Sequence, residues 1–351
     1  MKRRRVLVWT GTAFLVVLAL LALAFPGLRD FDLSEYRTRP LSFFFDDATV
    51  AGTLHSPETD NPPVVLLVHG DGPADRYSGG AYMPLISTLL DSGIAVYSWD
   101  KPGVGESSGD WLSFSMEDRS RLASTALDTV KSQPEFRSSP IGFVGFSQGG
   151  WVVPILAEAP AKADFFVIIG GAVNWLRQGR YYTKRRLELA GADIKTVEAT
   201  LADAEAGNRK LLSAGYSYAS YLSDHTIGIP MSESRFAFVR RNALADSSAS
   251  LQRISAPILT LHGSGDLNVD PAYNSGHYRD FLEGRNDANR FLVIPDGSHA
   301  LLRTALFNQQ RDGDMPAWTK LAFALLGRKA YAPGALDTLT GWILERARKA
   351  G

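Results

Sequence analysis

Short apolar runs alternate with segments of helical spacing along most of this chain. The runs are Val64–Val68, "GIAVYSWD", "PIGFVGF" and "ADFFVIIGG", and glycine or a polar residue closes each one. A short, wholly apolar run of this kind is typical of a strand buried on both faces of a parallel sheet. Between the runs, Tyr82–Ser92, Ser115–Ser132 and Gln148–Ala159 show helical spacing. The alternation predicts an α/β fold with a mostly parallel central sheet and helices on both faces.

The alternation is interrupted once. Residues 172–253 mix polar and apolar side chains, and we expect them to form a helical insertion. Its helical stretches are expected near Val173–Ala190, Asp193–Ala214 and Met231–Leu244. Strand and helix alternate again from "APILTLHGSGD" through "RFLVIPDGSH". The core of the protein is therefore predicted in two parts, residues 40–171 and 254–351.

The segment "FVGFSQGG" places Ser147 in a G-x-S-x-G motif between a predicted strand and a predicted helix. So tight a turn strains the serine backbone, while Gly145 and Gly149 leave room for the crossing chain. The hydroxyl is then presented at the carboxyl edge of the sheet. We interpret Ser147 as a nucleophile; the alternative is an incidental serine in a glycine-rich turn.

A nucleophilic serine needs backbone N–H groups that stabilise the developing oxyanion. One should be the amide of Gln148, directly after the nucleophile, and the other should come from a loop after an earlier strand. "HGDGP" follows Val64–Val68, so the amide of Asp71 is the candidate, with Gly72 second. The Asp71 carboxylate would repel an oxyanion, so we expect it to turn away, toward Arg76.

The acid and the base of the predicted site should each follow a later strand. Asp266 comes first after "ILTLHGSG", and we favour it over Asp270, which suits a helix N-cap before Pro271. His299 follows the last predicted strand and completes the order Ser, Asp, His. The other five histidines fit local hydrogen bonding better. In this arrangement His299 takes the Ser147 proton and Asp266 orients the imidazole ring.

With these motifs the chain resembles the α/β-hydrolases, and more narrowly the bacterial serine esterases and serine-aminopeptidase-like hydrolases with an "HGSGP…DR" loop. Here that loop reads "HGDGPADR", and "DKPGVGESSG" matches the family's D-x-x-G-x-G-x-S-x-G stretch. The resemblance implies an eight-stranded sheet, an insertion that caps the active site, and ester hydrolysis through an acyl-enzyme. Asp71 departs from the pattern, which has serine there. Asp100 is expected to accept backbone hydrogen bonds rather than to act as an acid.

The same triad would serve several activities. We favour a carboxylic-ester hydrolase over a peptidase or amidase, because a peptidase would need acids that bind a peptide amine. The acids of the insertion have helical spacing among basic residues and fit a solvated face: Glu188, Asp193, Glu198, Asp203 and Glu205. Acyl transfer to an alcohol or amine differs from hydrolysis only in water access and stays open. A non-catalytic binding protein on the same fold is the alternative of another class.

The insertion is rich in aromatic residues, and we expect these to favour a hydrophobic acyl or aromatic group in a small-molecule ester. They are Trp175, Tyr181, Tyr182, Tyr216, Tyr218, Tyr221, Phe236 and Phe238. A second apolar stretch lies within Leu301–Pro333 and includes "AWTKLAFALLGRKAY". It could form a core helix, which we favour, a second lid, or a membrane-facing patch.

The N-terminal residues 1–28 are expected to form a membrane anchor or a signal peptide. Four basic residues in "MKRRR" are followed by Val6–Phe25, an uncharged run long enough at about 1.5 Å per residue to span a ~30 Å hydrocarbon core. The run predicts either a membrane anchor or a signal peptide cleaved after Ala24, with a buried helix as third alternative. The first two export the catalytic domain, anchored to the membrane or secreted into the periplasm or medium. A linker to about Arg39 follows.

Composition excludes some classes of function. Lys+Arg and Asp+Glu number 37 each, so no excess of basic charge points to a nucleic-acid partner. There is no cysteine, which rules out disulfides and thiolate metal sites. We see no clustered metal ligands and no phosphate-binding glycine loop, so we expect neither a metal nor a cofactor.

Overall fold

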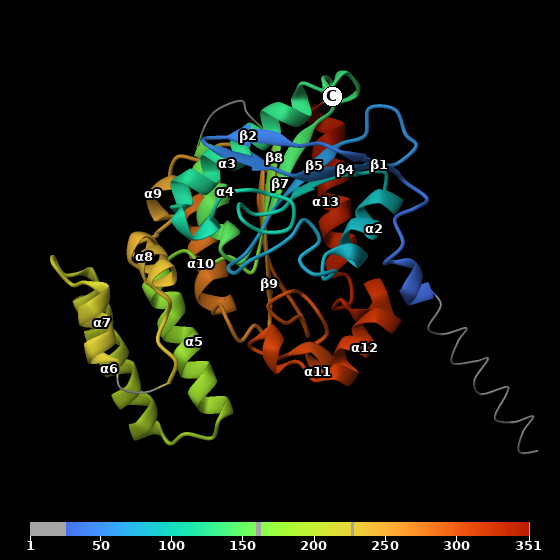
Figure 1. Ribbon diagram of the computed structural model, residues 1–351. Coiled ribbons are helices and arrows are strands. Elements are labelled where there is room, and N and C mark those ends of the chain that lie inside the picture. Colours follow the sequence, from blue (N-terminus) through green and yellow to red (C-terminus); the bar gives the residue numbers. More distant parts are fainter. Residues whose placement is uncertain (1–25, 159–162, 226–227, 351) are drawn as a thin grey trace, which may run out of the picture.

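The computed structural model describes residues 26–158, 163–225 and 228–350 (Figure 1). The predicted anchor or signal peptide falls mainly on residues 1–25, outside the described residues, and stays a prediction. Among the residues that the structure does describe, no helix is both long enough and apolar enough to cross a membrane.

An eight-stranded sheet forms the centre of the molecule, as predicted. Its spatial order is β1 (Arg37–Pro40), β4 (Gly52–Ser56), β6 (Ala95–Trp99), β5 (Val64–Val68), β7 (Ile141–Phe146), β8 (Phe165–Ile169), β9 (Ile258–Gly263) and β10 (Arg290–Ile294). The six strands from β6 to β10 are parallel, while β4 is antiparallel to both β6 and β1. The carboxyl ends of the parallel strands therefore share one edge of the sheet.

The start of the core differs from the expectation. Residues 37–40 are not a linker but the edge strand β1, which pairs with β4. Its sequence "RTRP" is exposed throughout, so it lacks the apolar signal of a buried strand. A tight turn follows: Asp46 has a φ of 48° between β2 (Phe43–Phe45) and β3 (Ala48–Val50).

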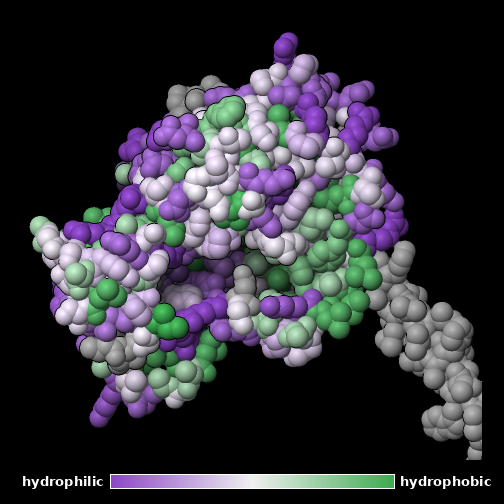
Figure 2. Space-filling view, viewed as in Figure 1, coloured by the Kyte–Doolittle hydropathy of each residue, from purple (hydrophilic) through white to green (hydrophobic). Residues whose placement is uncertain are grey.

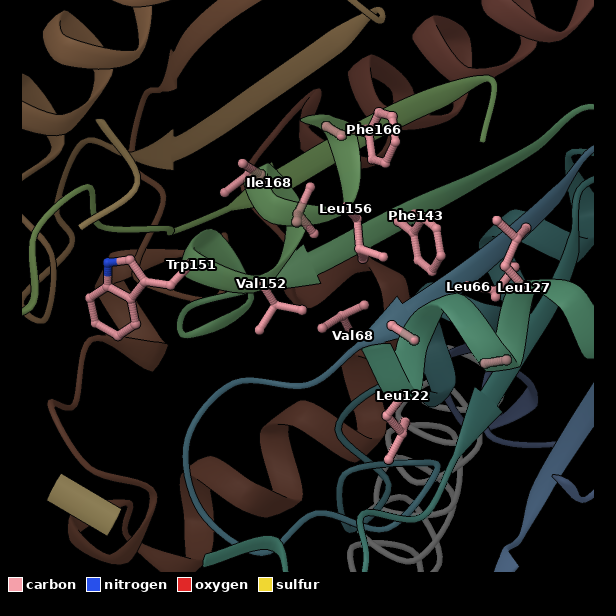
Figure 3. Close-up of a cluster of buried hydrophobic side chains, with 14 of the residues drawn as sticks. Leu66, Val68, Leu122, Leu127, Phe143, Trp151, Val152, Leu156, Phe166 and Ile168 are labelled. Carbon is pink, nitrogen blue, oxygen red and sulfur yellow. The ribbon is translucent and has the colours of Figure 1, made fainter. Parts of the chain in front are cut away.

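Each central strand is buried on both faces, which explains its unbroken apolar sequence. Val64, Leu66 and Val68 of β5 belong to one hydrophobic cluster, and Val65 and Leu67 to the other. The first cluster lies under α3 (Met116–Lys131), α4 (Gly149–Glu158) and α10 (Pro271–Leu282), and Figure 3 shows its centre. The second lies under α2 (Met83–Asp91) and α13 (Ala335–Ala350).

The insertion forms a separate helical layer beside the sheet domain (Figure 1). It contains α5 (Trp175–Leu189), α6 (Ile194–Leu212), α7 (Tyr218–Asp224) and α8 (Glu233–Asn242), which we call the cap. The short α7 was not predicted. The last part of the predicted insertion belongs to the core, because Leu251 of α9 (Ser248–Leu251) is fully buried in the first cluster.

The segment after β10 is helical but is not a core helix. It contains α11 (Thr304–Phe307) and α12 (Ala317–Leu326), and only Thr319 of α12 is buried. The expectation of a core helix is therefore wrong: one face of α12 packs against the molecule, and its other apolar side chains remain exposed. Four short 3-10 helices complete the fold: η1 (Trp111–Ser113), η2 (Pro134–Phe136), η3 (Asp312–Asp314) and η4 (Gly327–Ala330).

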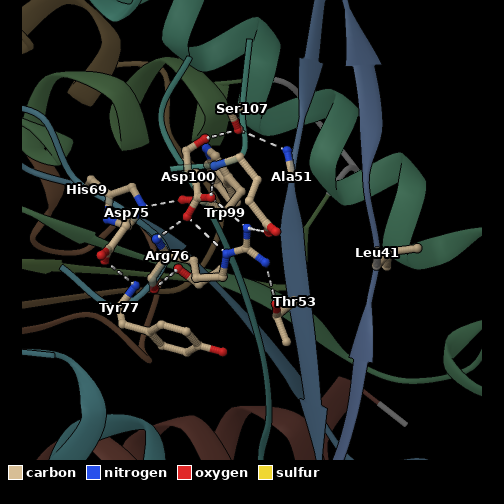
Figure 4. A network of polar contacts seen from close by, with 12 residues as sticks. Leu41, Ala51, Thr53, His69, Asp75, Arg76, Tyr77, Trp99, Asp100 and Ser107 are labelled. Atoms are coloured by element: carbon tan, nitrogen blue, oxygen red, sulfur yellow. Dashed lines mark hydrogen bonds and ion pairs between the residues drawn. The ribbon is translucent and has the colours of Figure 1, made fainter. Parts of the chain in front are cut away.

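A buried ion pair fixes the loops that follow β5 and β6 (Figure 4). The Asp100 carboxylate accepts bonds from the Arg76 guanidinium at 2.9 and 2.6 Å and from the Arg76 amide at 2.7 Å. It also accepts the amide of Glu106 at 2.9 Å. Burial opposes ionisation, but the bonds from Arg76 and the backbone outweigh it and hold the pKa of Asp100 below its usual value. Asp100 therefore accepts backbone donors, as predicted, and is not a proton donor.

Replacing Arg76 by methionine would leave the Asp100 carboxylate buried without its countercharge. We expect Arg76→Met to lower the free energy of unfolding by about 3–5 kcal/mol in urea denaturation at pH 7. The control is Arg39→Met, which removes an exposed pair with Glu135 and should cost less than about 1 kcal/mol.

The same pair makes the stability depend on pH. Since the folded-state pKa of Asp100 is lowered, its contribution is complete above the unfolded value of about 3.9 and is lost as pH falls through the folded value. The difference between wild type and Arg76→Met should therefore shrink in acid. A difference that grows as pH falls would contradict this assignment.

Candidate active site

Ser147 occupies a strained turn at the carboxyl end of β7. Its φ is 49°, a left-handed conformation that costs a non-glycine residue about 1–3 kcal/mol. Its amide donates to the carbonyl of Ile169 in β8 at 2.9 Å. A Cβ at Gly145 would lie 2.6 Å from Val153, and one at Gly149 would lie 3.2 Å from the Val68 carbonyl oxygen. The glycines thus admit the close backbone packing that the motif predicted.

The structure brings His299 and Asp266 together. The His299 Nδ1 lies 2.8 Å from Oδ2 of Asp266, whose side chain is buried. The other carboxylate oxygen accepts the amides of Asn268 and Val269 at 2.7 and 2.9 Å. The alternative acid, Asp270, instead caps α10 by accepting the Tyr273 amide at 3.1 Å.

His299 also lies beside the turn that holds Ser147. A Cβ at Gly170 would be 3.0 Å from Nδ1 and Cε1 of the His299 ring. Gly170 directly follows Ile169, whose carbonyl accepts the Ser147 amide. The three predicted residues therefore meet at one edge of the sheet, after β7, β9 and β10.

The cap holds the loop that carries Asp266, which the sequence did not predict. The Tyr181 hydroxyl of α5 donates to the Asp266 carbonyl at 2.8 Å, and Gln178 donates to the Asn268 carbonyl at 3.0 Å. These residues lie in the insertion, far along the chain from Asp266. The helical spacing of α5 gave no indication of which polar side chains face the loop.

The Asp71 carboxylate was expected to bind Arg76, but it binds a different arginine. Arg76 is engaged with Asp100, and Asp71 instead binds both ends of the Arg235 guanidinium on α8, at 2.8 and 2.5 Å. Burial opposes ionisation, yet the bonds from Arg235 lower the pKa of Asp71, so it is a carboxylate at pH 7. The amide of Gly72, the second-choice oxyanion donor, already donates to the Asp71 carboxylate at 2.8 Å.

Two buried cations fix the carbonyls of the same loop. Lys101 Nζ donates to the carbonyls of Gly70 and Gly72 at 2.6 and 2.7 Å. Arg119 of α3 donates to the carbonyl of His69 and, at 2.7 Å, to the side-chain oxygen of Gln148. Burial lowers the pKa of Arg119 to about 10 and, together with Arg119, lowers that of Lys101 well below its ordinary value. Neither residue was predicted, because Lys101 stands at a variable position of "DKPGVGESSG" and Arg119 lies outside every motif.

His69 and His262 bond locally, as expected. Their Nε2 atoms lie 2.6 and 2.9 Å from the carbonyl oxygens of Trp99 and Gly171. Burial lowers both pKa values, that of His69 to about 3, so both rings are neutral at pH 7. Among the described residues, no three His, Asp or Glu side chains form a cluster that could hold a metal ion.

A small cavity lies beside Ser147. Its volume is about 80 Å³, and Asp71, Gln148, Trp151 and Trp175 line it. Of the eight aromatic cap residues expected to shape the substrate pocket, only Trp175 lines this cavity. Most of the others build the interior of the cap: Tyr216, Tyr218, Tyr221 and Phe236. On the surface, Figure 2 shows a hollow between the cap and the segment of α11 and α12.

Comparison with known proteins identifies a family. Residues 60–304, more than half of the chain, match the family model described as serine aminopeptidase, S33. The chain belongs to this hydrolase family. A search of curated proteins gave no match.

Solved structures show the same α/β-hydrolase fold. The esterase Pf2001 of Pyrococcus furiosus is 16% identical at a TM-score of 0.55, over 85% of this chain and 93% of its own. Est1E of Butyrivibrio proteoclasticus, solved with ferulic acid bound, is 14% identical in sequence with a TM-score of 0.55. The match covers 88% of this chain and 98% of Est1E. DcsB, solved with a substrate analogue, is 13% identical in sequence with a TM-score of 0.56. The match covers 89% of this chain and 99% of DcsB. At these identities the likeness concerns the fold alone.

The contact of Gly170 with His299 gives this hydrolase a test of ring placement. We expect Gly170→Ala to lower kcat on p-nitrophenyl acetate by about 10²-fold, because the new methyl would displace the imidazole. Gly191→Ala is the matched control, since Gly191 also has a positive φ but open space around it. Backbone strain alone should cost each variant about 1–2 kcal/mol of stability, and Gly170→Ala should lose more, because its Cβ would also lie 2.9 Å from the His299 carbonyl oxygen. Equal kcat values for the two would contradict the placement.

Proposed function

We propose that this protein is a serine hydrolase that cleaves carboxylic esters through an acyl-enzyme. The observation that carries the proposal is the 2.8 Å contact between His299 and the buried Asp266, beside a serine held at a φ of 49°. A strained serine, an oriented imidazole and a buried carboxylate at one sheet edge are the parts that nucleophilic catalysis requires.

The contacts assign a role to each group. Because Nδ1 of His299 faces Asp266, Nε2 is the nitrogen that takes the Ser147 proton. The serine oxygen then attacks the ester carbonyl, and the protonated imidazole returns the proton to the departing alcohol. Water, activated by the same nitrogen, attacks the acyl-enzyme and releases the acid. Asp266 keeps the ring oriented, because its second oxygen is held by two backbone amides.

Backbone amides are the proposed oxyanion donors. Gln148 precedes the first residue of α4, so its amide belongs to the leading N–H groups that have no partner within the helix. The amide of Asp71 is the second proposed donor, since that of Gly72 is occupied. Lys101 and Arg119 hold the neighbouring carbonyls, which keeps the loop in place without reorganisation during the reaction.

The charges near the cavity favour an ester over a peptide with a free amine. Asp71 is the acidic residue that lines it, and Arg235 already neutralises that carboxylate. The seven acids of the cap lie exposed on its surface: Glu188, Asp193, Glu198, Asp203, Glu205, Asp224 and Glu233. A substrate amine would therefore find no unpaired carboxylate among the lining residues. The cavity volume of about 80 Å³ favours a short acyl group instead of the bulky one expected from the aromatic cap.

Replacing the nucleophile tests the proposal directly. With p-nitrophenyl esters from acetyl to decanoyl, the full chain should prefer the short acyl groups, and Ser147→Ala should lose at least ~10³-fold in kcat. A fluorophosphonate should label the wild type but not this variant. Ser138→Ala, an exposed serine, is the control and should keep both activity and labelling.

Other outcomes would redirect the assignment. Cleavage of aminoacyl p-nitroanilides without ester cleavage would identify a peptidase. Acyl transfer to an added alcohol that outpaces hydrolysis would identify a transferase. Labelling that survives in Ser147→Ala would refute the proposed nucleophile.

Arg235 should matter for turnover although it comes from the cap. Arg235→Gln would leave the Asp71 carboxylate unpaired near the developing oxyanion, and we expect kcat to fall about 10- to 100-fold. Adding Asp71→Asn should restore most of the loss, because the repulsive charge is then gone. Arg241→Gln is the control on the same helix, since Arg241 donates to the carbonyl of Leu112 instead. A double variant as slow as Arg235→Gln would contradict this electrostatic role.

We also propose that the catalytic domain is exported. The basic residues before the uncharged run Val6–Phe25 favour a cytoplasmic N-terminus and a domain on the other side of the membrane. We favour an uncleaved anchor over cleavage after Ala24, because the run is longer than most signal-peptide cores and Pro26 would follow the cut closely.

A further inference from the structure

The helix α12 is apolar on its outer side as well as on the side that packs against the molecule. Its inner side contributes Ala322, Phe323 and Leu326 to a small cluster under α11 and η4. On the outer side, Trp318 and Leu321 are 59% and 60% exposed. Figure 2 shows hydrophobic residues gathered over α12, on the same face as the hollow beside the cap. A surface helix normally turns polar residues to water, so an apolar outer side marks an interaction surface.

The residues that follow the N-terminal run are fixed directly to this helix. Phe31 contacts Phe323 edge to face, with ring centroids 5.7 Å apart. Gly27 packs so closely that a Cβ there would lie 1.9 Å from the Leu325 carbonyl oxygen. Leu28, between them, is 48% exposed. The start of the described chain and the outer side of α12 thus form one surface, which we call the α12 surface (Leu28, Trp318 and Leu321).

A buried ion pair makes this attachment rigid. The Asp30 carboxylate accepts the amide of Arg328 at 2.6 Å and its Nε at 2.7 Å, directly after α12. Arg328 also reaches Asp91 of α2 at 2.7 Å. Residues 27–31 therefore cannot move away from α12 without breaking a buried charge pair, which is costly.

Together these contacts point to the occupant of the α12 surface. The uncharged run Val6–Phe25 ends one residue before Pro26. If that run spans a bilayer, Pro26 emerges at the headgroups and the residues fixed to it lie there too. Tryptophan and leucine are suited to that depth, and Lys320 and Lys329 add basic charge near them, whereas Arg328 is paired with Asp30 and Asp91.

We infer that the α12 surface lies in the membrane interface and holds the catalytic domain against the bilayer. This inference rests on the proposed membrane anchor and goes beyond it, because an anchor alone would leave the domain free to tilt. Contact along α12, about 15 Å long at 1.5 Å per residue, fixes which side of the hydrolase faces the lipid.

The absence of native cysteine allows a direct test with single spin labels. The full chain is reconstituted in nanodiscs that contain zwitterionic and anionic lipid, with a nitroxide on Leu321→Cys or Trp318→Cys. The control is Phe44→Cys, since Phe44 is 78% exposed and apolar but lies on the β2–β3 hairpin. Power saturation with oxygen and with a water-soluble nickel complex reports the depth of each label.

We expect the labels on α12 to be reached by oxygen more than by nickel, and the label at position 44 to show the reverse.

If all three labels behave as aqueous while the chain stays in the discs, the anchor stands and the membrane contact is refuted. Dipolar broadening at position 321 that vanishes on dilution with unlabelled chain would assign the surface to a second copy and refute it as well. A chain that does not stay with the discs would overturn the anchor and the contact together. Hydrolysis of p-nitrophenyl acetate by the same samples reports the proposed function independently.

Discussion

The close backbone packing around Ser147 positions the whole carboxyl edge of the sheet. A Cβ at Gly150 would lie 2.6 Å from Cα of Gly171, and the Ser147 amide is bonded to β8. At several glycines around Ser147 there is no space for a side chain larger than hydrogen, so the turn cannot relax into an ordinary loop. The strain in Ser147 persists because the β-sheet and α4 enforce it. The loops that carry His299 and Asp266 therefore pack beside a turn that does not move.

Charged side chains hold the loop at residues 70–72, which lies beside the turn at Ser147. The loop at Gly70–Gly72 has few side chains that could hold it, so its carbonyls are fixed by Lys101 and Arg119 from elsewhere in the fold. Asp71 adds a negative charge that Arg235 balances from the cap. Lys101 is buried, and a buried charge is costly unless it has partners, which here are two carbonyls. The loop is therefore rigid for electrostatic reasons, whereas the turn at Ser147 is rigid for steric ones.

The sequence predicted those parts of the fold whose signal is local. The central strands were found because burial on both faces demands unbroken apolar residues. Ser147, Asp266 and His299 were predicted together because each follows a predicted strand, although β10, which precedes His299, is partly exposed. β1 was missed because an exposed edge strand needs no apolar pattern. The partner of Asp71 was missed because Arg235 lies 164 residues away along the chain, where only tertiary structure decides the contact. The aromatic residues of the cap were misread, since a small helical layer needs its own core and the composition alone does not separate that core from a pocket.

The Asp71–Arg235 pair has a consequence for the catalytic cycle as a whole. In the proposed mechanism the charge beside the reacting carbonyl depends on the position of α8, because Arg235 is the cap residue that pairs with the Asp71 carboxylate. A substrate that held the cap away from this loop would face an uncompensated carboxylate beside the developing oxyanion. The seated cap therefore supplies a countercharge as well as a wall of the cavity.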